Sequence, residues 1–133
     1  MSSRRIVKVL VVEPQLGMRN LLDDLLSVCD CKVEAVASDS EALKLLRSAE
    51  ADYEAVLCPA PAVGAKHSLV SKVRHSQGAL KELPVLCHSH ASGLQERAMA
   101  YESGASEYVL LPVSPTELEA AVRRWAGKPH KPY

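Results

Sequence analysis

The stretch Tyr53-Glu54-Ala55-Val56-Leu57-Cys58-Pro59-Ala60-Pro61-Ala62-Val63-Gly64 decides the fold, because it joins a short apolar run to a loop rich in proline. Such a run is typical of a buried β-strand that ends in a tight loop. Similar apolar runs occur at residues 6–12, 84–88 and 107–111, and helical patterns separate them. Strands that alternate with helices predict a parallel sheet covered by helices, with the functional site at the carboxyl ends of the central strands.

The segments between these runs have apolar residues at helical spacing, starting near residues 15, 39, 65, 91 and 115, and residues 32–37 alternate as a shorter strand. Capping boxes begin two of the helices, at Ser38–Glu41 and at Ser114–Glu117. The first helix is expected to bury the stripe Met18, Leu21, Leu22, Leu25 and Cys29. The pattern predicts an α/β fold, a three-layer α/β/α sandwich of flavodoxin-like (βα)5 type with strand order 2-1-3-4-5.

Composition limits the classes of function. The chain of 133 residues fits one domain, expected over residues 1–127, with residues 128–133 as a tail or the start of a linker. The 16 Lys and Arg residues balance 16 Asp and Glu residues, which argues against nucleic-acid binding by this domain. No apolar run approaches the roughly 20 residues of a membrane span. We expect a cytoplasmic protein, either a full-length chain or a domain of a longer one.

The cysteines at positions 29, 31, 58 and 87 lack the paired spacing of a zinc ribbon or a redox site. We therefore expect free thiols. A metal site that combines Cys58 and Cys87 with His88 and His90 is disfavoured, because strand alternation sends His88 to the other face. We predict no metal and no cofactor.

Three stretches of the chain resemble one known family. Val9-Leu10-Val11-Val12-Glu13-Pro14-Gln15 places an acidic residue after a strand, and Pro84-Val85-Leu86-Cys87-His88-Ser89-His90-Ala91 places a hydroxyl residue after another. The most specific stretch is Gly104-Ala105-Ser106-Glu107-Tyr108-Val109-Leu110-Leu111-Pro112-Val113-Ser114-Pro115-Thr116-Glu117-Leu118. Together they resemble the CheY-like receiver domain of response regulators, and the resemblance covers nearly the whole chain.

The resemblance also identifies what this chain lacks. Receivers transfer a phosphoryl group to an aspartate with the help of Mg²⁺, held by a pair of acids, and of a lysine that offsets negative charge. This chain keeps Glu13 as one acid, but Pro14 replaces the second and Leu111 replaces the lysine. The acceptor position falls on Cys58, or after a shift by one residue on Leu57 or Pro59. None of these side chains can form an aspartyl phosphate.

Other positions keep the family pattern. Ser89 and Tyr108 resemble the hydroxyl and aromatic residues of the receiver switch, and with Arg97 they are candidate interface residues. The Leu111–Pro112 bond resembles one that is usually cis in the family. We also expect the Leu111 side chain to enter the former site and to pack against Cys58.

The sequence thus favours a degenerate receiver, or pseudo-receiver, that is not an enzyme and that acts as a protein-interaction module in bacterial two-component or phosphorelay signalling. Its partner would be another signalling protein, further domains of the same chain, or a second copy bound through the face formed by the fourth helix, fifth strand and fifth helix. The alternative is a ligand-sensing or redox-sensing domain that uses the vacated pocket around Cys58. The identity of the partner stays open.

Overall fold

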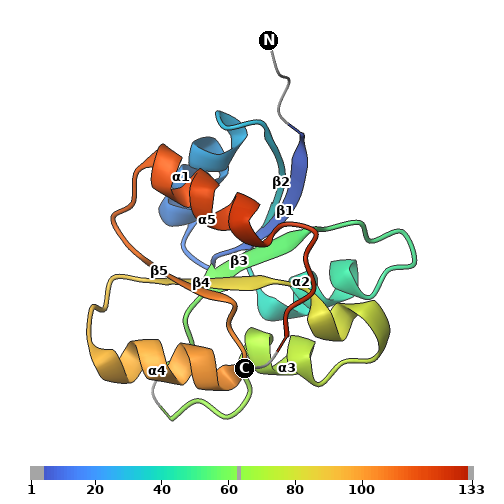
Figure 1. Ribbon diagram of the computed structural model, residues 1–133, viewed down its shortest axis with the longest axis vertical. Coiled ribbons are helices and arrows are strands. Elements are labelled where there is room, and N and C mark those ends of the chain that lie inside the picture. Colours follow the sequence, from blue (N-terminus) through green and yellow to red (C-terminus); the bar gives the residue numbers. More distant parts are fainter. Residues whose placement is uncertain (1–4, 63, 132–133) are drawn as a thin grey trace.

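One parallel sheet with strand order β2-β1-β3-β4-β5 forms the middle layer of the computed structural model, which describes residues 5–62 and 64–131 (Figure 1). This order and the α/β/α layering confirm the sequence prediction. The strands are β1 (Val7–Val12), β2 (Cys31–Val36), β3 (Ala55–Pro59), β4 (Val85–Ser89) and β5 (Glu107–Leu110).

Five α-helices cover the two faces of the sheet (Figure 1). One face carries α1 (Leu16–Ser27) and α5 (Pro115–Trp125), and the other carries α2 (Asp39–Leu46), α3 (Leu69–Arg74) and α4 (Leu94–Ser103). A 3-10 helix, η1 (Gly78–Glu82), follows α3. Within the described ranges no helix is both long enough and apolar enough to cross a membrane.

The strand β3 lies at the centre of the hydrophobic core. Its residues from Ala55 to Cys58 are all buried, because β1 and β4 pair with it on both sides and helices cover both faces. Side-chain alternation divides the strand between two core clusters. Val56 and Cys58 pack with α2 and α3, whereas Ala55 and Leu57 pack with α1 and α5.

The capping predictions are confirmed. The Ser38 hydroxyl accepts a hydrogen bond from the Glu41 amide at 3.2 Å, and Ser114 accepts one from Glu117 at 3.1 Å. Gly104 ends α4 with φ of 111°, a left-handed conformation that glycine adopts without strain. A side chain at this position would also collide with Arg74.

Two helix predictions were inaccurate. The buried residues of α1 are Leu22 and Leu26, while Leu21 is 48% exposed. Leucines fill two adjacent stripes of this helix, so spacing alone did not identify the inner one. The helix expected over residues 65–75 starts only at Leu69, because Ser68 caps it through a hydrogen bond from the Ser71 amide at 3.2 Å.

The side chain of Arg74 connects the end of α3 to two loops. Its Nε donates to the Gly104 carbonyl at 2.8 Å, and its Nη1 donates to the Leu83 carbonyl at 2.6 Å. Its Nη2 donates to the hydroxyl of Ser106 at 3.3 Å, which itself accepts from the Val85 amide at 3.2 Å. Burial lowers the pKa of Arg74 to about 10, so the guanidinium is still charged at neutral pH.

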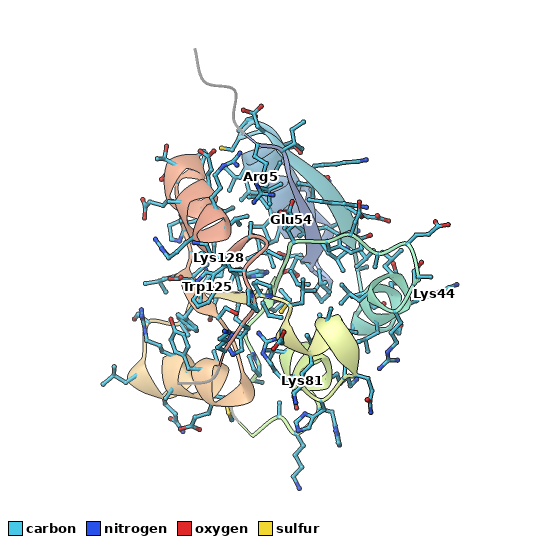
Figure 2. All side chains as sticks on the ribbon, turned by 45° about the vertical axis from the view of Figure 1, so that its right-hand side comes forward. Arg5, Lys44, Glu54, Lys81, Trp125 and Lys128 are labelled. Carbon is cyan, nitrogen blue, oxygen red and sulfur yellow. The ribbon has the colours of Figure 1, made fainter. Side chains whose placement is uncertain are left out.

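The segment after α5 lies against the amino-terminal ends of the strands. The His130 amide donates to the Glu82 carbonyl at 2.7 Å, and His130 Nδ1 lies 2.8 Å from the Ser106 hydroxyl. Nearby, the Gly127 amide donates to the Glu54 carbonyl at 3.3 Å, and the Glu54 carboxylate pairs with Arg5 (Figure 2). Residues 128–131, predicted as a tail, are thus held to the domain, and residues 1–4 and 132–133 lie outside the described part.

We expect Arg74→Met to lower the free energy of unfolding by about 3 kcal/mol, because it leaves the partly buried carbonyls of Gly104 and Leu83 without a donor. Chemical denaturation followed by circular dichroism measures this change. The exposed Arg47→Met is the matched control and should change stability by no more than about 0.5 kcal/mol. Equal stability of the two variants would contradict a structural role for Arg74.

Candidate functional site

The carboxyl ends of four strands meet at one edge of the sheet. Glu13 follows β1, Pro59 ends β3, Ser89 ends β4 and Leu111 follows β5. Backbone hydrogen bonds fix this edge: the Ala60 amide donates to the His88 carbonyl and the Leu111 amide to the Ser89 carbonyl, both at 2.8 Å. The candidate site is therefore built on rigid strand ends.

The structure separates the three residues considered for the acceptor position. Leu57 and Cys58 lie within β3 and are buried in opposite core clusters. Pro59 is the last residue of the strand and pairs in register with His88, so it occupies the edge where the four strands end. A proline side chain offers neither a nucleophile nor a metal ligand at this place.

The expected contact between Leu111 and Cys58 was wrong. Leu111 is buried in the cluster that packs against α1 and α5, whereas Cys58 belongs to the cluster on the other face of the sheet. The error has a physical cause. Cys58 alternates with Leu57 and Pro59 along β3, so its side chain points away from the face that Leu111 joins. The Leu111–Pro112 peptide bond itself is cis.

A buried pair of titratable side chains occupies this edge and was not found from the sequence. The imidazole Nε2 of His88 lies 3.6 Å from the Glu13 carboxylate oxygen Oε1, which is too far for a hydrogen bond. His88 is only 4% exposed, and its Nε2 has no hydrogen-bond partner among the described residues. Burial lowers the pKa of His88, although the Glu13 carboxylate opposes this effect. His88 is consequently neutral at pH 7.

Glu13 keeps its place through other contacts. Its second carboxylate oxygen, Oε2, accepts a hydrogen bond from the Gln15 amide at 2.8 Å. The Arg19 guanidinium donates to the Glu13 carbonyl, also at 2.8 Å. The signal in the sequence was strand alternation, which places His88 on the face opposite Cys87. This alternation separates His88 from the two cysteines and turns it toward the face of Glu13.

The site does not fit Mg²⁺. This ion prefers an octahedral set of oxygen ligands. Glu13 supplies a carboxylate, but the side chains of Pro14 and Pro59 supply no oxygen, and the nearest buried group is an imidazole. Among the described residues no group of three or more His, Cys, Asp or Glu side chains could hold a metal ion.

On the opposite face, Cys58 and Cys87 are register partners on the adjacent strands β3 and β4, and both are buried free thiols. A hydrogen bond with Cys87, together with burial, raises the pKa of the Cys58 thiol well above its ordinary value. Cys58 also lines a surface hollow of about 450 Å³ between the loops that precede α2 and α3, with Val12, Pro59, Pro61 and Leu69.

The residues that resemble the receiver switch are held in one arrangement. Ser89 accepts a hydrogen bond from the Ala91 amide at 3.0 Å. Tyr108 is only 5% exposed, and its hydroxyl donates to the Ala91 carbonyl. The Arg97 guanidinium covers the tyrosine ring at 5.2 Å from its centroid. Tyr108 is therefore an inward-pointing residue, and it does not itself form an exposed contact surface.

Comparisons with known proteins give relatives of one kind, although no family model matches the sequence. The chain is 25% identical over 125 residues to a protein of Cyanophora paradoxa named probable transcriptional regulator ycf27, covering 94% of this chain and 50% of the relative. The ycf27 protein of Guillardia theta is 27% identical over 116 residues, covering 87% of this chain and 44% of the relative. The chain thus spans about half the length of the curated relatives it matches.

Solved receiver structures superimpose over almost the whole chain. The chemotaxis response regulator CheY4 of Vibrio cholerae matches with a TM-score of 0.76 and 21% identity, covering 90% of this chain and 98% of that one. The receiver domain of the sensor histidine kinase PA1611 from Pseudomonas aeruginosa, which holds magnesium in its active-site cleft, matches with a TM-score of 0.77 and 20% identity, covering 93% and 100%. This chain has the fold of a CheY-like response-regulator receiver domain.

Proposed function

We propose that this chain is a degenerate receiver domain, which acts as a protein-interaction module in two-component or phosphorelay signalling in the cytoplasm and catalyses no reaction. One observation carries the proposal. At the ends of β1, β3 and β5, the residues Pro14, Pro59 and Leu111 carry no charge, and the carboxylate of Glu13 has a neutral imidazole, His88, as its neighbour.

Phosphoryl transfer depends on charges that this edge does not supply. The transferring group carries negative charge, and active sites stabilise it with cations and with donors fixed in position. Here Leu111 is buried among apolar side chains, and His88 is held neutral by burial. A carboxylate nucleophile is absent from β3 as well, because residues 55–59 contain no Asp or Glu. The lysine cation, a charged histidine and a carboxylate nucleophile are thus all missing, which favours signalling without phosphorylation of this domain.

The partner face we propose consists of α4, β5 and α5. β5 is an edge strand, so its outer backbone groups are open to a partner. Exposed apolar side chains on this face are Leu94, which is 83% exposed, and Leu110, which is 40% exposed. Arg97 adds a cation beside them. Because hydrogen bonds hold Tyr108 inward, we expect this face to bind constitutively, without a switch.

The hollow beside Cys58 supports the alternative function, a ligand sensor, since most of its lining residues are apolar or small. It gives less support to a redox sensor. The reactive form of cysteine is the thiolate, and the pKa of Cys58 is raised. Both Cys58 and Cys87 are also buried.

We expect no phosphorylation when the chain is incubated with acetyl phosphate and Mg²⁺. Intact-mass spectrometry should show an unchanged mass, while an active receiver in the same mixture gains one phosphoryl group. The variant carrying Pro14→Asp, Pro59→Asp and Leu111→Lys tests the assignment of the acceptor position. It should gain some phosphorylation, and the variant with Cys58→Asp in place of Pro59→Asp should gain none. Phosphorylation of the unmodified chain would refute the proposal.

We expect Cys58 and Cys87 to resist alkylation by iodoacetamide in the folded chain near pH 7, because burial and a raised pKa keep Cys58 as a protonated, inaccessible thiol. Peptide mapping by mass spectrometry measures the labelling of each cysteine. The same chain in denaturant is the control, in which all four cysteines should react. Labelling of Cys58 at similar rates in both states would instead favour the redox alternative.

We expect Leu110→Glu and Arg97→Glu to weaken self-association of the chain, because both residues lie on the face of α4, β5 and α5. Sedimentation velocity over a range of concentrations measures this effect. Tyr108→Ala is unsuitable, since removing a buried aromatic ring would destabilise the fold by about 3 kcal/mol or more. Leu21→Glu on α1 is the control for an exposed apolar residue. If only this control weakened association, the interface would lie on the opposite side.

A further inference from the structure

A groove crosses the surface between α2 and η1, away from the edge where the strands end. It consists of two adjoining hollows of about 640 Å³ and about 190 Å³. The larger is lined by Leu46, Arg47, Lys72, His75, Ser76, Gln77 and Leu80. The smaller is lined by Leu46, Ser48, Ala51, Tyr53, Ala79, Leu80 and Leu83. Leu46 and Leu80 line both hollows, so the two lie side by side, and we call the pair the α2–η1 groove.

The α2–η1 groove combines apolar and cationic side chains. Leu46 is buried, and Leu80 and Tyr53 pack against the same core cluster while remaining partly exposed. Arg47 ends α2, and Lys72 lies in the last turn of α3. Both cations are exposed. The result is a hydrophobic patch beside two positive charges.

Nothing in the described part of the chain neutralises these cations. No Asp or Glu lines either hollow, and among the described residues neither Arg47 nor Lys72 forms an ion pair. Acidic side chains lie near the smaller hollow, where the Tyr53 hydroxyl donates to Glu34 at 2.6 Å and Asp52 pairs with Lys8. The positive charge of the groove therefore lies at the larger hollow, which Arg47 and Lys72 line. Lys44 on α2 also projects away from the protein (Figure 2). In a chain of zero net charge this is a local excess of positive charge.

We infer that the α2–η1 groove binds an acidic amphipathic segment of a partner protein. Apolar side chains of that segment would cover Leu46 and Leu80, and its carboxylates would lie beside Arg47 and Lys72. Opposite charges at the rim of a hydrophobic patch give specificity and speed association. This surface differs from the face of α4, β5 and α5, so the domain could hold two partners at once.

A nucleic acid fits this groove less well. Phosphate backbones need a series of cations along their path, and their affinity comes mostly from that charge. The cations of this groove are Arg47 and Lys72 at its larger hollow, and the patch of Leu46 and Leu80 beside them offers a phosphate backbone no side-chain donor. A cation at the C-terminal end of a helix also stabilises that helix through its dipole, so a test must separate binding from stability.

The probe is a synthetic peptide of about four helical turns, with leucines on one face and glutamates on the others. NMR titration of the ¹⁵N-labelled chain should show amide shifts confined to Leu46, Arg47, Lys72 and residues 75–80. Arg47→Glu and Lys72→Glu should each weaken binding about tenfold or more, and higher salt should weaken it further. Lys128→Glu makes the same charge change elsewhere and should bind as the unmodified chain does.

Circular dichroism melts of these variants serve as the stability control, and each variant should unfold in a single cooperative transition, as the unmodified chain does, because both cations are exposed. The inference fails if the peptide binds all variants equally, or if the shifts map to α4 and β5. It also fails if a thymidine oligonucleotide binds this groove more tightly than the peptide. Loss of self-association in the Arg47→Glu variant would assign the groove to a second copy instead. None of these outcomes depends on whether the domain is phosphorylated.

Discussion

The burial of β3 on both faces is the constraint on which the rest of the structure depends. A central parallel strand lies between two neighbouring strands and beneath helices on both sides, so its interior side chains must be apolar. A polar side chain that could take part in a reaction can therefore stand only at the carboxyl end of this strand. In this chain that point is Pro59. The residue at this one position therefore decides whether β3 offers a nucleophile, and a proline side chain offers none.

Much of the fold could be predicted because each unit has a local signal. The strand order follows from five alternating units, and the caps at Ser38 and Ser114 follow from their spacing to a glutamate. The inner stripe of α1 and the start of α3 could not be assigned as well. Four of the five leucines in α1 satisfy two stripes equally, and tertiary packing selects between these stripes. The contacts of Arg74 join residues up to 32 positions apart, and no local pattern encodes them.

In the candidate site, too, the positions of residues could be predicted from local signals, whereas their contacts could not. The sequence was enough to place Glu13, Pro14, Ser89 and Leu111 at the carboxyl edge of the sheet, because each stands at or near the end of a recognisable strand. The contacts among these residues could not be predicted, since a contact depends on the face of the sheet to which each side chain points. Leu111 and Cys58 both lie near the carboxyl edge, yet the sheet separates them. Glu13 and His88 are 75 positions apart in the sequence, and only the pairing of β1, β3 and β4 brings them together.

The charges that receiver phosphorylation requires depend on one another, which supports the proposal that this chain lacks them as a group. A lysine at position 111 would be a buried cation without a partner if the acids were missing, and an unpaired buried charge is costly. Conversely, several acids without a cation or a metal would repel one another. Glu13 alone is tolerated, because the Gln15 amide satisfies one of its oxygens. His88 beside it stays neutral through burial, so it adds no second charge. Each replacement therefore makes the others less costly, and restoring one charged residue at a time would destabilise the edge before it recovered any chemistry.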